Sequence, residues 1–145
     1  MIRKANKNDI PKIVEIYNKI LANEENGLIS IRWIRGIYRA FNIEKDAIER
    51  GDLFAYEKEE KTVGASAIIN KRQVDVYKKG KWKYKVNDDK VMVSHSLIVE
   101  PSFVHSGIGK KFVDFYESYA KKNIHSILLF KGCNILYSYY IISYI

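Results

Sequence analysis

The sequence predicts a domain of the α/β (α+β) class, in which a mixed, mostly antiparallel sheet is flanked by helices. The first observation is the order of the expected elements: strand, helices, three or more strands, helix, strand. Consecutive strands favour antiparallel pairing, whereas the closing strand–helix–strand unit favours a parallel pair. The second is the length of 145 residues with one cysteine, Cys133. These fit a single domain, 1–145, that needs no disulfide framework.

A short strand and a helix open the chain. Residues 2–5 are the expected first strand. Asp9 is expected to cap the helix, and Pro11 lies in the first turn, where a missing N–H costs little. The apolar residues that follow recur at helical spacing: Ile10, Ile13, Val14, Ile16, Tyr17, Ile20 and Leu21.

Two further helices are expected before the main strands. An amphipathic stretch after Ser30 has its apolar residues on one side: Trp33, Ile34, Ile37, Tyr38 and Phe41. A short third helix is expected to begin at Asn42 as the cap and to end at Gly51. Its predicted inward residues are Ile43, Ala47 and Ile48.

The strands of the predicted sheet follow. Residues 53–56 and 62–69 are expected to form two strands of a meander, and residues 91–99 form a strong apolar strand that Pro101 ends. A helix is expected from Gly107 onward. The apolar run 127–130 is the last expected strand.

Most of the net positive charge, +5 of +8, lies between Lys71 and Lys90. The chain has 25 Lys and Arg against 17 Asp and Glu, which gives a formal charge of +8. Apolar and charged residues alternate on both sides of Gly80, a pattern that predicts a hairpin. One interpretation is a solvated hairpin whose lysines protect a sheet edge. The other is a cationic wall for a polyanionic ligand such as coenzyme A, an acidic substrate or RNA.

A glycine-containing loop at a helix N-terminus, residues 104–111, is the segment that most directly predicts chemistry. Helix N-termini present free N–H groups and a partial positive charge, and therefore bind phosphate. Gly107 and Gly109 let the backbone approach an anion, and Lys110 and Lys111 add charge. The alternative is a glycine turn that lets the helix pack closely on a strand.

The ordered set of segments resembles the GCN5-related N-acetyltransferase (GNAT) family over roughly residues 1–130. The Gly-x-Gly alone is a weak signal, and the resemblance depends on several separate segments: 2–5 with 9–10, 33–38, 51–55, 63–68, and 96–101 with 107–109. In one departure, Val104 stands where the family's loop has Gln or Arg.

The resemblance implies an N-acetyltransferase that uses acetyl-CoA, with no metal. The pantetheine amides would pair with the backbone of Leu97 and Val99, and the diphosphate would lie on the N–H groups from His105 to Lys110. The implied cofactor-binding residues are Leu97, Ile98, Val99, Val104, His105, Ser106, Gly107, Ile108, Gly109 and Lys110.

Catalysis would be direct attack of an amine on the thioester. His95 is the best-placed base, and alternation places it on one face with Val93, Leu97 and Val99 unless the strand is bulged. The amide of Leu97 or Ile98 is a candidate oxyanion donor. The alternative for His95 is a structural role in the strand.

The acceptor side of the site would be lined by aromatic residues. By the same resemblance, Trp33 and Tyr38 would contact the amine substrate. Their alternative is a place in the helix core.

The resemblance stops after Phe130. The tail 130–145 has no charge after Lys131 and is rich in Tyr and Ile, so the usual C-terminal helix and strands are expected to be missing or replaced. Such a β-prone segment must pack on the sheet or pair with another chain, which favours a homodimer. A changed C-terminus also leaves open a catalytically impaired remnant that binds coenzyme A. Cys133 is expected to be a bystander, and Asn134 and Tyr140 receive no role.

The expected partner is a small-molecule or peptide amine. A nucleic-acid-binding module that uses the basic hairpin is a less favoured alternative. No secretory signal opens the chain and no run reaches the length of a membrane helix, so the expected location is the cytoplasm.

Overall fold

The computed structural model describes residues 1–31, 33–36, 40–58, 61–73, 87–123, 127–131 and 139–144. Their strands form one six-stranded sheet in which the spatial order is the order along the chain. The strands are β1 (Ile2–Lys4), β2 (Leu53–Glu57), β3 (Val63–Asn70), β4 (Val91–Val99), β5 (Ile127–Lys131) and β6 (Tyr139–Tyr144). Neighbouring strands are antiparallel except β4 and β5, which are parallel. The predicted mixed, mostly antiparallel sheet is therefore confirmed.

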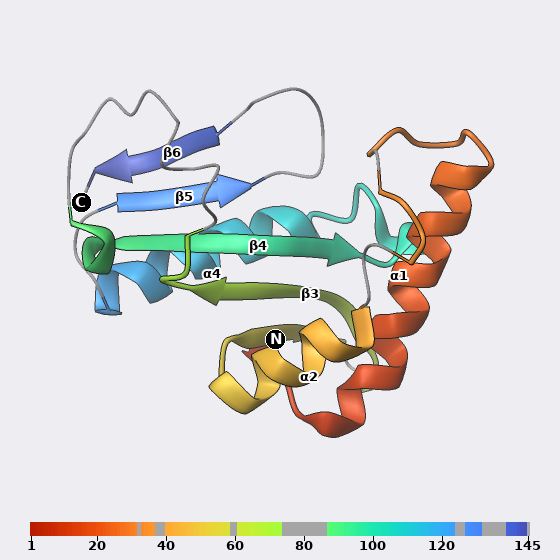
Figure 1. Cartoon of the computed structure of the whole chain (residues 1–145), viewed down its shortest axis with the longest axis horizontal. Helices are drawn as coiled ribbons and strands as arrows, with labels where there is room; N and C mark the ends of the chain where they lie inside the picture. The colour runs from red at the N-terminus through yellow and green to blue at the C-terminus, as the bar shows by residue number, and fades with distance from the viewer. Residues whose placement is uncertain are drawn as a thin grey trace.

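Helices cover both faces of the sheet (Figure 1). The helices α1 (Ile10–Glu25) and α2 (Ala40–Arg50) lie on one face, and α4 (Ile108–Asn123) lies on the other. The short 3-10 turns are η1 (Lys7–Asp9), η2 (Asp88–Lys90) and η3 (Pro101–Phe103). None of the helices in the described ranges is long and apolar enough to cross a membrane.

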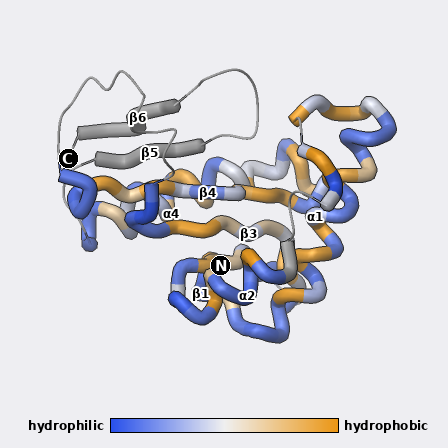
Figure 2. Tube along the Cα trace, in the orientation of Figure 1, coloured by the Kyte–Doolittle hydropathy of each residue, from blue (hydrophilic) through white to orange (hydrophobic). Residues whose placement is uncertain are grey.

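Two hydrophobic clusters lie on either side of β3 and β4, which are mainly hydrophobic (Figure 2). The cluster under α4 consists of Phe54, Ala65, Ala67, Ile69, Met92, Ile108, Phe112, Tyr116 and Ala120. The cluster under α1 and α2 consists of Ile13, Ile16, Tyr17, Ala47, Leu53, Ala55, Val63, Ile68 and Ile98. In addition, the Tyr116 hydroxyl donates a hydrogen bond to the carbonyl oxygen of Met92, 2.5 Å away, which ties α4 to β4.

The predicted helix after Ser30 is wrong for the residues that the structure describes there. Residues 30, 31 and 33–36 are not helical, and one helix, α2, begins at Ala40. Gly36 adopts a φ of +86°, which lies outside the right-handed helical region. The Arg35 guanidinium also pairs with Glu25 at 2.8 Å, which holds this loop against the end of α1.

The inward face of α2 also differs from the prediction at one position. Ile43, expected to point inward, is 42% exposed, whereas Glu44 is fully buried. Residues at i, i+3 and i+4 share one side of a helix. Glu44 therefore lies on the same stripe as Ala47 and Ile48.

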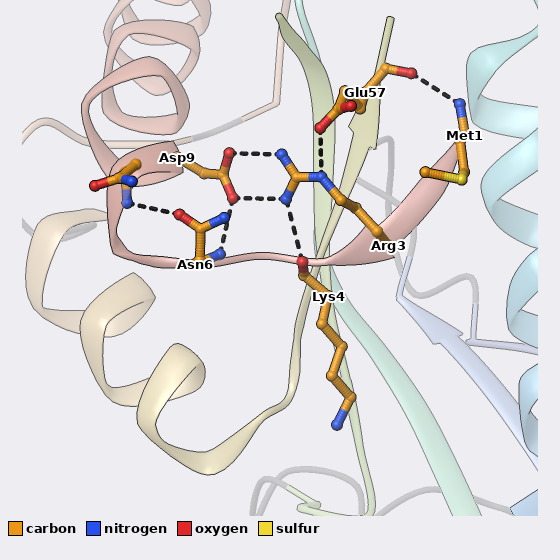
Figure 3. Close-up of polar contacts among 7 residues, drawn as sticks. Met1, Arg3, Lys4, Asn6, Asp9 and Glu57 are labelled. Atoms are coloured by element: carbon orange, nitrogen blue, oxygen red, sulfur yellow. Dashed lines mark hydrogen bonds and ion pairs between the residues drawn. The ribbon is translucent and has the colours of Figure 1, made fainter. Parts of the chain in front are cut away.

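A polar network fixes the start of α1 (Figure 3). The Asn6 side chain accepts a hydrogen bond from the Asn8 N–H at 2.9 Å, and the Asp9 carboxylate accepts one from the Asn6 N–H at 2.8 Å, which together form a capping box around η1. Asp9 also binds the Arg3 guanidinium of β1 through two hydrogen bonds, and Arg3 contacts Glu57 of β2. Asp9 occupies the N-cap position of α1, as predicted, but its side chain makes no capping hydrogen bond to α1 itself.

The pairing of the last strand shows how the uncharged tail joins the sheet. β6 pairs antiparallel with β5, from Ile127 opposite Tyr144 to Lys131 opposite Tyr139. A strand therefore replaces part of the C-terminal elements expected from the resemblance. Cys133, Asn134 and the predicted basic hairpin around Gly80 lie outside the described residues.

Candidate functional site

A β-bulge in β4 shapes the centre of the candidate site. The register pairs Ile68 of β3 with His95, and then Ser66 with Ile98. Two steps on β3 therefore match three steps on β4, so β4 carries one extra residue. Ser96 takes the strain of the bulge with a φ of +50°, which is unusual for a residue other than glycine.

The bulge reverses which residues of β4 face each helix layer. Met92, Leu97 and Val99 pack with the α4 cluster, whereas Ile98 belongs to the α1 cluster. His95 is the direct partner of Ile68, a residue of the α1 cluster, and so lies on the α1 face. The predicted shared face with Leu97 and Val99 was conditional on an unbulged strand, and the bulge places His95 on the opposite face from these two residues.

The His95 ring has a polar partner at the end of β3. Its Nε2 lies 3.0 Å from the carbonyl oxygen of Arg72. A carbonyl oxygen only accepts hydrogen bonds, so this contact requires the proton on Nε2. Any proton abstraction by His95 would therefore fall to Nδ1.

β4 separates from β5 at its C-terminal half. The parallel pairing with β5 runs only from Val91 to Ser94. Within the described ranges no strand pairs with residues 95–99 on the side facing β5. An extended ligand could add to this edge as a strand would, because its amides would find backbone partners there.

The loop after β4 turns the chain directly into α4. The N–H of Phe103 binds the Glu100 carbonyl at 2.8 Å, and the Ser106 N–H and hydroxyl bind the Phe103 carbonyl at 3.1 Å and 2.5 Å. His105 and Gly107 adopt positive φ values of 70° and 78°. Val104 is 53% exposed.

The first turn of α4 presents free N–H groups. The first intrahelical bond is from the Lys111 N–H to the Gly107 carbonyl, at 3.0 Å. The N–H groups of Ile108, Gly109 and Lys110 precede it and have no acceptor within the helix. A Cβ built on Gly107 or Gly109 would meet no atom within 4 Å. No atom therefore crowds the Cβ positions of these two glycines, so the backbone here can approach an anion closely.

Of three comparisons with known proteins, only the comparison with solved structures finds matches. No protein-family model and no curated protein sequence matches the chain. Solved structures do match. One is a GNAT-family acetyltransferase from Listeria monocytogenes, with a TM-score of 0.70 and 22% identity over 90% of this chain and 74% of that one. Another is an N-acetyltransferase from Staphylococcus aureus, with a TM-score of 0.63 and 18% identity over 90% of this chain and 71% of that one.

A third match is N-acetylglutamate synthase from Neisseria gonorrhoeae, solved with coenzyme A and N-acetyl-glutamate. The TM-score is 0.57 and the identity 18%, over 90% of this chain and 24% of that one. The chain has the GNAT fold. The fold expected from the sequence resemblance is therefore confirmed.

Charged side chains surround the turn of the GNAT fold from β4 into α4. Glu100 is 4% exposed and accepts hydrogen bonds from the Lys19 ammonium of α1 at 3.0 Å and 3.2 Å. Lys12 lies 3.5 Å from the same carboxylate. At the start of α4, Lys110 pairs with Asp114 on the exposed helix surface, and this pairing raises the pKa of Lys110.

Aromatic residues in this GNAT fold line the layer on the α1 face. Trp33 is half-buried and its ring stacks on that of Tyr17, with centroids 5.5 Å apart. Tyr38, the other predicted acceptor residue, lies outside the described residues. The structure therefore brings Trp33 to the same face as His95 and leaves Leu97 and Val99 on the opposite face.

Three residues near the site were not found from the sequence. Tyr17 was assigned only to the apolar side of its helix, and Glu44 and Glu100 were given no functional role. The spacing of Glu44 three residues before Ala47 was the available signal. No group of three His, Cys, Asp or Glu residues in the described ranges could hold a metal ion.

Proposed function

We propose that the protein transfers the acetyl group of acetyl-CoA to a small-molecule or peptide amine. The observation that carries this proposal is the open, glycine-lined N-terminus of α4 beside the unpaired edge of β4. The likeness to the Neisseria gonorrhoeae structure, which contains coenzyme A, supports the same cofactor class.

The described residues fit the two parts of acetyl-CoA that need polar partners. The diphosphate would accept hydrogen bonds from the N–H groups of Ile108, Gly109 and Lys110, where the helix dipole also favours negative charge. The pantetheine amides would pair with the edge of β4 at Leu97 and Val99. Gly107 and Gly109 leave room for the phosphates, since no neighbouring atom lies where their side chains would be.

The reaction would be a direct transfer. The amine nitrogen attacks the thioester carbonyl carbon, the C–S bond breaks, and the thiolate of coenzyme A takes up a proton that the amine loses. A backbone amide at the bulge, that of Leu97 or Ile98, would donate a hydrogen bond to the oxyanion. His95 Nδ1 is the proposed acceptor of the amine proton, which then passes to the thiolate of coenzyme A.

Calorimetric titration tests the proposal. Acetyl-CoA should bind the wild-type chain, and Gly109→Leu should abolish binding because the new side chain would fill the space before the amides. Leucine is a good helix former, so this variant should fold. Ser118→Leu, an exposed change on the same helix, is the matched control and should bind normally. If the wild-type chain binds no acetyl-CoA at millimolar concentration, the proposal is wrong.

Binding alone does not establish turnover, so thiol release is measured next. Free coenzyme A should appear when acetyl-CoA is mixed with a panel of amines. Binding without thiol release would indicate the impaired remnant that an altered C-terminus allows.

A further inference from the structure

Glu44 is a buried acid on the side of α2 that carries Ala47, a member of the cluster under α1 and α2. Its side chain has no exposed surface, and neither carboxylate oxygen has a hydrogen-bond partner among the residues that the structure describes. Buried polar groups in proteins almost always have a partner, and an ionised carboxylate without one is strongly unfavourable. Glu44 therefore needs either a proton or a cation.

Aromatic groups adjoin this carboxyl. Tyr17 of α1 is near enough for its hydroxyl to lower the pKa of Glu44, although the contact falls outside ordinary hydrogen-bond geometry. The Tyr17 ring in turn stacks on Trp33. Aromatic faces attract alkylammonium cations, and a carboxylate supplies the opposite charge.

The position of Glu44 connects it with the proposed reaction. It lies on the stripe of α2 that includes Ala47, a member of the cluster under α1 and α2. That cluster contains Ile98, which follows the bulge, and Ile68, the strand partner of His95. Glu44 is thus on the face of the sheet that carries the candidate base.

We propose that Glu44 binds the positively charged group of the acceptor and so selects cationic alkylamines, diamines among them. This inference rests on the proposed acetyltransferase function. In the ligand-free chain burial raises the pKa of Glu44 to about 7, and a bound ammonium group would hold the carboxylate in its charged form.

Glu44 has no exposed surface, so a ligand reaches its carboxylate only if the side chains around it move. A cation beside the carboxylate would also lie near Tyr17, whose ring stacks on that of Trp33.

Calorimetry with diaminobutane, and with butylamine for comparison, tests the inference in the wild-type chain, Glu44→Gln and Glu49→Gln. Glu49 is exposed on the same helix, so its variant carries the same change of charge. Glu44→Gln should weaken diaminobutane binding by about tenfold or more, as expected for loss of a desolvated charge pair, whereas Glu49→Gln should leave it unchanged. Circular dichroism should show that both variants are folded.

The titrations are run with and without saturating acetyl-CoA, so that two failures can be told apart. Absence of acetyl-CoA binding contradicts the proposed function. If wild-type protein binds no diaminobutane, or if Glu44→Gln binds it as well as wild type does, the role of Glu44 is wrong even when acetyl-CoA binds normally.

Discussion

The Glu100 carboxylate, at the end of β4, binds the ammonium group of Lys19, 81 residues earlier in the chain, at 3.0 Å. Glu100 is nearly buried, whereas Lys19 is partly exposed. Lys12 of the same helix lies 3.5 Å from Glu100. The contact fixes α1 against the strand that leads into the proposed diphosphate site.

Removal of the Lys19 charge should lower stability in a graded way. Lys19→Gln is expected to lower the urea midpoint, and the double variant with Lys12→Gln should lower it further, because Lys12 is the remaining cation near Glu100. Equilibrium urea unfolding measures both changes. Lys7→Gln, an exposed change on η1, is the control and should leave the midpoint in place. Equal midpoints for wild type and the double variant would show that the ion pairs contribute nothing.

Gly107 and Gly27 provide a matched pair for the proposed anion site. Both have positive φ and open space around the Cβ position, but Gly27 follows α1. Alanine at either position should cost about 1–2 kcal/mol, since L-residues disfavour this conformation. Gly107→Ala should also weaken acetyl-CoA binding, and Gly27→Ala should not. Calorimetry and thermal unfolding check the two effects, and equal cofactor binding by both variants would count against the site.

Substitutions of Ser96, the strained residue of the bulge, should raise or lower stability according to how easily the new residue adopts a positive φ. Ser96→Gly is expected to leave stability equal or improved, because glycine adopts positive φ freely. Ser96→Val should destabilise the fold by about 1–3 kcal/mol, since a β-branched residue is strained there. Urea unfolding measures both, and hydrogen exchange at Leu97–Val99 reports whether the bulge persists. A stable Ser96→Val variant with unchanged exchange would contradict the assigned strain.

The pH dependence of stability should reveal Glu44. Burial raises the pKa of Glu44 from 4.5 to about 7, with an opposing effect from Tyr17. Below pH 4.5 both folded and unfolded states hold the proton. Between pH 4.5 and 7 only the folded state holds it, so stability falls as pH rises, by about 3 kcal/mol in total, and then levels off.

The variant Glu44→Gln removes this titration. Compared with wild type it should gain stability progressively from pH 4.5 to 7, whereas Glu49→Gln should follow the wild-type curve. Asp9 changes the pH dependence of stability in the opposite direction, at lower pH, because its pKa is lowered and not raised. The hydrogen bond from Arg3 lowers its pKa below 3.8, so its contribution is present above 3.8 and is lost as the pH falls through the folded-state pKa. Parallel curves for wild type and Glu44→Gln would mean that Glu44 is not perturbed.

The position of β6 bears on the proposed homodimer. It is the last strand of the sheet, and residues 132–145 contain no charged residue to discourage edge pairing. Sedimentation velocity should show a dimer whose population increases with concentration, and Ile141→Lys should reduce it. A monomer at all concentrations would contradict the proposal.

Periodicity in the sequence predicted the regular elements well and the local exceptions poorly. The strand 91–99 was assigned at its observed bounds because apolar residues begin and end it and Pro101 follows. A bulge in this strand was considered, but its position at Ser96 could not be predicted, because it depends on the register with β3 and not on β4 alone. The helix expected after Ser30 was wrong at Trp33 and Ile34, which lie in a loop where Trp33 stacks on Tyr17 and Ile34 is exposed.

Similar reasons apply to the candidate site. The glycine loop at 104–111 was recognisable because free amides at a helix N-terminus are a local property of the backbone. The side of the sheet on which His95 lies could not be predicted in the same way, because it depends on the bulge. Glu44 was missed because an acidic residue is usually solvated, and only the position of α2 against α1 shows that it is enclosed.

The extra residue at Ser96 has a consequence for any mutational scan of β4. Before Ser96, even-numbered positions such as Met92 face α4, whereas beyond it odd-numbered positions such as Leu97 and Val99 do. A plot of tolerance to polar substitution along this strand should therefore change phase at one residue. The residue at which this pattern changes would mark the bulge from amino-acid preferences alone.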